Sequence, residues 1–357
     1  MTRDILSAST RTASTSSTNN FDAIRLFAAA QVALSHAISH LDIKADWAYP
    51  LNFFPGVPIF FFISGFLIFQ SWNNIKVNRA IIFFTNRILR LYPALLTCFA
   101  FSATSIFYSG YLDDRHVSLA QVWILAISQI TFFQFYNPDF LRGYGVGVIN
   151  GSLWTISAEL QFYVLTPLIH FLYSHYRRLA IGGFLLFVIF NIANTLFNNG
   201  ESFVGKIISV TFVPWLFMFL FGAYVSTNKK LQDYFLKLNT TGLIFAYILI
   251  YYISMSLNIG SGNGIGFLPY VILSALIVKL AFTRPELSNF VLKKNDISYG
   301  VYIYHMPIIN LFIFYGFTHS YVSLASAIFF TGIAALISWV LVERPALHLK
   351  AVALRRY

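Results

Sequence analysis

Charged side chains are scarce in this sequence: Asp, Glu, Lys and Arg make up only 10% of its 357 residues. Soluble globular domains usually carry roughly 25% charged residues, whereas hydrophobic side chains account for 57% of this chain. This composition excludes an ordinary soluble enzyme and indicates a protein whose solvent is lipid. The polar stretches between the apolar runs are too short to hold a separate soluble domain.

Cysteine is nearly absent too, since Cys98 is the only one in the chain. A single thiol excludes an intrachain disulfide and argues against covalent thiol catalysis. The first 20 residues are rich in Ser and Thr and lack the contiguous apolar core of a signal peptide. We therefore expect residues 1–20 to form a disordered cytoplasmic tail and the first apolar segment to direct membrane insertion.

Long apolar runs, in contrast, recur along most of the chain. Runs of about 18 to 22 residues are long enough to cross a hydrocarbon core of roughly 30 Å as helices. Eleven apolar segments can be marked, at residues 21–41, 52–71, 82–108, 118–136, 152–174, 179–197, 204–226, 241–258, 264–282, 297–318 and 321–343. They predict an all-α fold, a polytopic bundle of transmembrane helices.

The basic residues indicate how many of these segments cross the bilayer. If the N-terminus is cytoplasmic and 118–136 does not cross, nearly all of the 24 basic residues lie on the cytoplasmic side, as the positive-inside rule requires. The exceptions are Arg25, Lys44, Arg115, Arg142 and Lys206. We therefore predict about ten spanning helices with both termini cytoplasmic, and a re-entrant or outer-surface segment at 118–136. The same rule accounts for the net charge of +11, so no nucleic-acid partner is expected.

Ionisable side chains within hydrocarbon are costly, which makes each of them a candidate for function. Arg25 and His36 are eleven residues apart in the first segment. At 100° per residue they share one face of a helix, roughly 16 Å apart along its axis. Glu159, the only acidic residue deep within a predicted span, lies at about the same depth as His36. We predict a His36–Glu159 pair with His36 as a general base, the alternative being a structural hydrogen bond between two helices.

Three further sets of residues stand out. Arg87 and Arg90 begin the third segment on neighbouring positions of one helical side, where two guanidinium groups suit phosphate, although positive-inside anchoring is the alternative. His305 lies among aromatic residues and fits either a packing or a functional role. Ser64 and Gly65 lie in the middle of the second segment, where small residues let helices approach closely.

Six motifs in order resemble those of the acyltransferase-3 family of membrane proteins, which includes O-acetyltransferases of bacterial surface sugars. The matching stretches are FDAIRLFAAAQVALSH with Arg25 and His36, PGVPIFFFISGFLI with Ser64, NRILRLYP with Arg87 and Arg90, SLWTISAELQFY with Trp154 and Glu159, SYGVYIYHMP with His305, and VERP. One departure is that the family's paired glutamates are here Glu159 followed by Leu160. Relatives with a fused extracytoplasmic hydrolase-like domain also exist, whereas this chain is expected to be a stand-alone enzyme.

The resemblance implies a transmembrane domain over residues 21–345, with a basic cytoplasmic tail over 346–357. It implies acetyl-CoA as the donor substrate, no permanently bound cofactor, and transfer to a carbohydrate hydroxyl, with lipopolysaccharide O-antigen as the first choice. The expected location is the bacterial inner membrane. The expected site has His36 and Glu159 as catalytic residues and Arg25, Arg87 and Arg90 on the donor. Trp154, Ser64 and His305 are expected to support substrate or structure.

Several alternatives stay open at this point. A proton-coupled transporter or exporter is a different class of function that the buried histidines and Glu159 would also serve, although it leaves the paired arginines unexplained. His36 and His40 offer at most two metal ligands, so no metal is expected. The sequence does not decide between direct transfer and an acyl-histidine intermediate, or between acetyl and another short acyl group.

Overall fold

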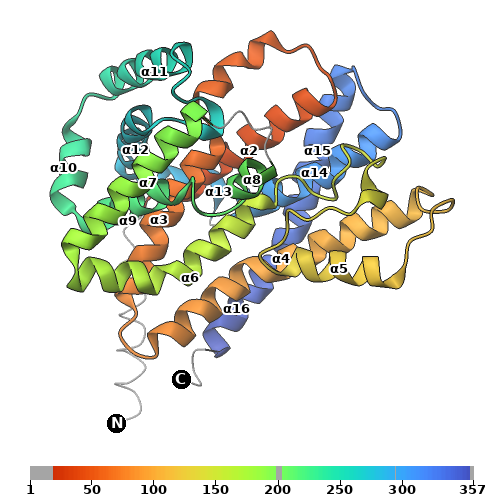
Figure 1. Ribbon diagram of the computed structural model, residues 1–357, viewed down its shortest axis with the longest axis horizontal. Helices are drawn as coiled ribbons and strands as arrows, with labels where there is room; N and C mark the ends of the chain where they lie inside the picture. The colour runs from red at the N-terminus through yellow and green to blue at the C-terminus, as the bar shows by residue number, and fades with distance from the viewer. Residues whose placement is uncertain (1–18, 198–202, 294, 354–357) are drawn as a thin grey trace.

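The computed structural model describes residues 19–197, 203–293 and 295–353, and this part of the chain is helical without any strand (Figure 1). The α-helices are α2 (Phe21–His40), α3 (Gly56–Asn74), α4 (Arg79–Tyr108), α5 (Leu119–Ile130), α6 (Trp154–His175), α7 (Arg177–Phe197), α8 (Phe203–Ser209), α9 (Leu216–Thr227), α10 (Lys229–Lys237), α11 (Thr240–Ser256), α12 (Phe267–Phe282), α13 (Leu287–Leu292), α14 (Ser298–Phe314), α15 (Tyr321–Ser338) and α16 (Arg344–Ala353). Short 3₁₀ turns lie at η1 (Asp46–Phe53), η2 (Asp139–Leu141) and η3 (Gly262–Gly264), and a π-helical turn at η4 (Trp339–Glu343). The predicted all-α membrane fold is confirmed.

Fewer helices than the predicted ten are long and apolar enough to cross a bilayer. Five described segments meet this condition, and α10 with α11, joined at a bend of 96°, would be a sixth. The segment 204–226, predicted as one span, is not one continuous helix, because α8 and α9 are separate helices with Pro214 in the break between them. Hydropathy cannot reveal such a break, since the residues on both sides of it are apolar.

The segment at 118–136 contains only the 12-residue helix α5, which starts with a capping box between Ser118 and Gln121. A helix of this length extends about 18 Å, less than the thickness of a hydrocarbon core. The chain that follows runs back over α14, where Asn310 accepts a hydrogen bond from the Val146 amide (3.1 Å) and donates to the Val148 carbonyl (2.8 Å). This loop leads directly into α6.

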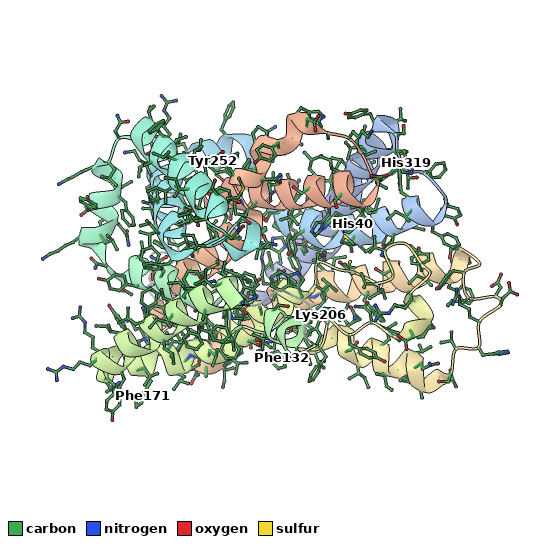
Figure 2. The ribbon with its side chains drawn as sticks, turned by 45° about the horizontal axis from the view of Figure 1, so that its top comes forward. His40, Phe132, Phe171, Lys206, Tyr252 and His319 are labelled. Atoms are coloured by element: carbon green, nitrogen blue, oxygen red, sulfur yellow. The ribbon has the colours of Figure 1, made fainter. Side chains whose placement is uncertain are left out.

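The core centres on α14, whose residues from Ser298 to Asn310 are all buried. It packs against α2, α4 and α15. α14 and α2 run in the same direction, since Asp296, just before α14, lies near Arg25, and the His319 amide, beyond its far end, bonds to the Leu41 carbonyl (2.8 Å). Figure 2 shows His40 and His319 on the same side of the molecule. Residues from the two helices therefore meet level by level.

A second seam joins α3 to α9 through glycines. A side chain at Gly65 would collide with the Phe219 carbonyl, and one at Gly222 would collide with the Phe62 carbonyl. The two backbones approach closely only because both positions lack a Cβ atom. This confirms the prediction that small residues beside Ser64 serve close packing, and it fixes the position of α3 between α2 and α6, against both of which it packs.

The predicted tails lie partly outside the described residues. Residues 1–18 and 354–357 are among those that the structure does not describe. In the described part of the predicted C-terminal tail, the chain continues as α16, which packs against α4.

Candidate active site

Five of the residues singled out in the sequence line one cavity of about 80 Å³. They come from four helices: Arg25 from α2, Ser64 from α3, Arg87 and Arg90 from α4, and Glu159 from α6. Tyr163, Tyr299 and Tyr302 complete much of the remaining polar wall. The structure thus brings together residues that are up to 134 positions apart in the chain (159 − 25).

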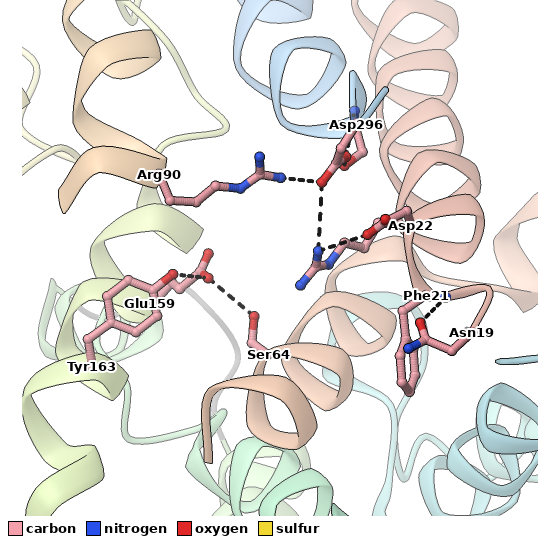
Figure 3. A network of polar contacts seen from close by, with 10 residues as sticks. Asn19, Phe21, Asp22, Ser64, Arg90, Glu159, Tyr163 and Asp296 are labelled. Carbon is pink, nitrogen blue, oxygen red and sulfur yellow. Dashed lines mark hydrogen bonds and ion pairs between the residues drawn. The ribbon is translucent and has the colours of Figure 1, made fainter. Parts of the chain in front are cut away.

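Asp296 pairs with two of the three arginines in this cavity (Figure 3). Its carboxylate accepts a short hydrogen bond from Arg90 and lies 3.7 Å from Nη1 of Arg25, which is also 3.4 Å from Asp22. Burial alone would raise the pKa of Asp296, but the Arg90 and Arg25 guanidiniums outweigh that effect and hold the pKa below its usual value. The charges of Arg25 and Arg90 are therefore already balanced within the protein.

Asp296 was not predicted as a site residue from the sequence. It directly precedes α14 and accepts hydrogen bonds from both the amide (3.2 Å) and the hydroxyl (2.5 Å) of Ser298. An acidic residue immediately before a conspicuous apolar run is a visible signal, although its partners are far away in the sequence.

Arg87 differs from its neighbour Arg90. Its Nη2 donates to Ser71 Oγ (3.1 Å), and its guanidinium lies over the rings of Phe83 (5.5 Å) and Tyr163 (5.7 Å). Its buried Nε has no hydrogen-bond partner, and no carboxylate forms an ion pair with it among the described residues. Arg87 thus lines the cavity without an ion-pair partner among the described residues.

The structure does not form the predicted His36–Glu159 pair. Glu159 instead accepts hydrogen bonds from Ser64 Oγ (3.3 Å) and Tyr163 Oη (2.5 Å). Position along a helix gives the depth of each residue but not its direction around the helix axis. α3 lies between α2 and α6 and packs against both of them. Glu159 therefore belongs to the arginine cavity and not to the histidine.

His36 pairs with His305 of α14, with 2.9 Å between Nδ1 of His36 and Nε2 of His305. His305 is fully buried, and its own Nδ1 is 3.3 Å from the Val301 carbonyl oxygen. A carbonyl only accepts, so Nδ1 of His305 carries a hydrogen, and its Nε2 in the neutral ring is an acceptor. His36 must then donate from Nδ1, which leaves the lone pair of its Nε2 free to take a proton.

Tyr302 connects the two parts of the site. It lines the arginine cavity, its hydroxyl is 2.7 Å from Thr155 Oγ1, and its ring centroid is 5.9 Å from that of His305. Tyr302 was not predicted as a site residue, although it lies three residues before His305 in the same motif. Arg25 and His36 sit at opposite ends of this arrangement, roughly 16 Å apart along α2.

Trp154 lies outside the cavity wall. Its ring packs against Trp215, with centroids 5.2 Å apart, and against Phe61 at 6.5 Å. Phe61 itself lines the cavity. Trp154 therefore contributes packing behind the site at the first turn of α6.

Comparison with known proteins relates this arrangement to characterised families. The profile of a family described as "Acyltransferase domain" matches residues 18–343. Nodulation protein 10 of Rhizobium leguminosarum bv. viciae is 29% identical over 363 residues, covering 95% of each chain. An O-acetyl transferase of Shigella phage Sf6 is 27% identical over 342 residues, covering 91% of this chain and 95% of the relative.

A third relative shares only part of its length with this chain. The peptidoglycan O-acetyltransferase OatA of Listeria monocytogenes is 28% identical over 140 residues, which cover 36% of this chain and 22% of the relative. No solved structure matches this chain significantly.

Proposed function

The chain belongs to the acyltransferase-3 family of membrane acyltransferases, and from this premise we propose that it moves an acetyl group from cytoplasmic acetyl-CoA to a hydroxyl of a cell-surface carbohydrate. A sugar of lipopolysaccharide O-antigen is the first choice of acceptor. Two relatives whose names specify O-acetyl transfer, one of them onto peptidoglycan, support the reaction class and a glycan acceptor. The proposed location is the bacterial inner membrane, with both termini cytoplasmic.

The arginine cavity is the proposed donor site. It lies toward the start of α2 and α4, which the distribution of basic residues assigns to the cytoplasmic side. Arg87 is the proposed phosphate-binding arginine, because its guanidinium forms no ion pair among the described residues, in contrast to Arg25 and Arg90. Arg25 and Arg90, both paired with Asp296, would instead hold the shape of the cavity.

His36 is the proposed general base, and the bond from His36 Nδ1 to His305 Nε2 is the observation that carries this role. Nε2 of His36 takes the proton from the acceptor hydroxyl as its oxygen attacks the thioester carbonyl carbon. A C–O bond forms and the C–S bond breaks, so that the coenzyme leaves as a thiolate. The imidazolium of His36 then returns the proton to that sulfur, which gives the free thiol of the coenzyme and restores the neutral imidazole.

A second order of events uses the same atom. Nε2 of His36 could attack the thioester directly, and the resulting acyl-imidazole would pass its acyl group to the sugar hydroxyl. Glu159 has no contact with His36 in either version, and its proposed place is beside Ser64 and Tyr163 on the donor side.

The purified protein in lipid nanodiscs tests the proposal directly. Acetyl-CoA carrying a labelled acetyl group is supplied together with de-O-acetylated O-polysaccharide, and ester-linked label in the glycan is measured. We expect transfer by the wild type and a loss of about 10²- to 10⁴-fold in His36→Ala, the usual contribution of a general base. Full transfer by His36→Ala at normal protein levels would refute the role of His36.

The acceptor needs a separate measurement. Surface glycans of cells with and without the gene are compared by mass and by sugar-resolved NMR. An acetyl group that is absent from every glycan of the deletion strain but present in the wild type identifies the acceptor. Unchanged lipopolysaccharide together with a changed second polymer would replace the first choice.

A further inference from the structure

A second cleft, of about 360 Å³, opens beside the C-terminal half of α2. Its walls come from α2, from η1 just after it, from the end of α11 and from η3, and Figure 1 shows α11 beside the segment that follows α2. Its volume lies within the range of roughly 300 to 1,000 Å³ typical of small-molecule sites. Its lining includes Gln31, Ser35, Tyr49, Asn52, Tyr251 and Asn263.

Aromatic rings form one wall of this cleft. Tyr49 packs edge-on against Phe53, with centroids 5.8 Å apart, and Phe53 lies 5.3 Å from Tyr251. Tyr251 is held rigidly, since its hydroxyl donates to the Asn52 carbonyl (3.0 Å) and accepts from the Gly262 amide (2.7 Å). Tyr49, in contrast, is 52% exposed and offers its ring to a ligand.

Uncharged polar groups, together with Pro55 and Met255, form most of the rest of the wall, and two of the polar side chains have no hydrogen-bond partner among the described residues. None of the described residues that line the cleft is charged. Gln31 is fully engaged with Ser35, the Leu51 carbonyl and the Gly56 amide. The exposed side chains of Asn52 and Asn263, however, have no hydrogen-bond partner among the described residues, which leaves two amides free to donate and accept.

An open aromatic ring beside free amides, without charge, is chemistry that suits a neutral sugar. The C–H face of a pyranose packs on an aromatic ring, and its hydroxyls exchange hydrogen bonds with amides. We propose that this cleft binds a neutral sugar residue of the acceptor glycan, next to the residue that receives the acetyl group. This proposal rests on the proposed function, since it supplies the acceptor half of that reaction.

The position of the cleft relative to His36 agrees with this role. Gln31 and Ser35 are four residues apart and therefore lie in one row on the same side of α2. His36 and His40 form a second row, about 100° around the helix from the first. Ser35 and His36 are both half-buried, so the helix surface between the two rows is partly open. A glycan held in the cleft would therefore have its next residue at the height of His36.

The experiment separates acceptor binding from the rest of the reaction. Nanodisc-embedded Tyr49→Ala and the double variant Asn52→Ala/Asn263→Ala are assayed with de-O-acetylated O-polysaccharide. We expect the KM for the glycan to rise about tenfold in the double variant, as two lost hydrogen bonds would cause. The KM for acetyl-CoA and the rate of acetyl-CoA hydrolysis without glycan should stay within about twofold of wild type.

Tyr252→Ala is the matched control, because Tyr252 is about as exposed (55%) as Tyr49 and follows Tyr251 on α11, but does not line the cleft. Aromatic side chains also anchor membrane proteins at the lipid interface. If Tyr252→Ala raised the glycan KM as much as Tyr49→Ala did, the rings would be interfacial anchors and the inference would be wrong. An unchanged glycan KM in the double variant would overturn the inference alone, whereas absence of transfer by the wild type would overturn the proposed function and the inference with it.

Discussion

Replacing Asp296 with Asn should destabilise the protein strongly. The carboxylate is only 12% exposed and is the shared partner of Arg90 and Arg25, whose side chains are 20% and 22% exposed. Removing one partner of a buried ion pair typically costs about 3 to 5 kcal/mol, because the remaining charge stays buried without compensation. Here two guanidiniums would lose their partner, although Arg25 keeps Asp22 at 3.4 Å.

The assay is chemical denaturation in detergent micelles, with the free energy of unfolding compared between Asp296→Asn and wild type. Asp233→Asn is the matched control, since Asp233 pairs with Lys229 (3.2 Å) on the exposed surface of α10. Such surface pairs one helical turn apart contribute about 0.3 to 0.5 kcal/mol. If the two variants lost the same small amount, the Asp296 pair would contribute no more than a surface contact, and the reasoning would be wrong.

The pH dependence of the same difference follows from the direction of the Asp296 pKa shift. A carboxylate whose pKa is depressed in the folded protein contributes stability that is present above the pKa of the unfolded chain, near 3.9, and is lost as the pH falls through the folded value. The difference between wild type and Asp296→Asn should therefore be constant from about pH 8 down to about pH 5. A difference that vanished already near pH 6 would contradict the pairing with Arg90 and Arg25.

Three further predictions concern the site and the packing around it. His305→Ala should lower kcat by about 10- to 100-fold, as expected when the group that orients a reacting histidine is removed. The KM for acetyl-CoA should change little. An unchanged kcat would contradict the role of His305 in positioning His36. Arg87→Ala should raise the KM for acetyl-CoA by roughly 10- to 100-fold, as for a lost charge-assisted hydrogen bond, and leave the glycan KM unchanged. If the variant and the wild type had the same affinity for acetyl-CoA, Arg87 would not contact a phosphate. Gly65→Ala should destabilise the fold by about 1 to 3 kcal/mol, because the added methyl group makes α3 collide with α9. The midpoint of chemical denaturation measures this loss. A midpoint equal to that of the wild type would contradict the close approach of the two helices.

The helices were the predictable part of this fold. Each of the eleven apolar segments contains a helix, because a long apolar sequence in lipid satisfies its backbone only in that form. The number of helices that span the bilayer was not predictable, since hydropathy averaged across residues 210–215 conceals the break between α8 and α9. Composition reports which residues tolerate lipid but not where a helix stops.

The site was predictable in its members and not in its pairings. Arg25 and Glu159 stood out because charge is costly in an apolar segment, and Arg87 stood out because it is paired with Arg90. The four residues do meet in one cavity. The predicted partner of His36 was wrong. The position of a residue along a helix gives its depth in the membrane, whereas the residue that its side chain meets depends on which helices are neighbours. Asp296 was missed because its partners Arg25 and Arg90 are far away in the sequence, so the apolar pattern alone does not connect it to them.

The burial of α14 has a consequence for how the protein is made. Synthesis proceeds from the N-terminus, so α2, α3 and α4 enter the bilayer long before the ribosome reaches Ser298. Both Asp296 and His305 arrive with this late helix, which occupies the centre of the bundle and not its edge. The earlier helices must therefore leave a place for it, and a nascent chain released before residue 296 would carry the arginines and His36 without the partners that hold them in position.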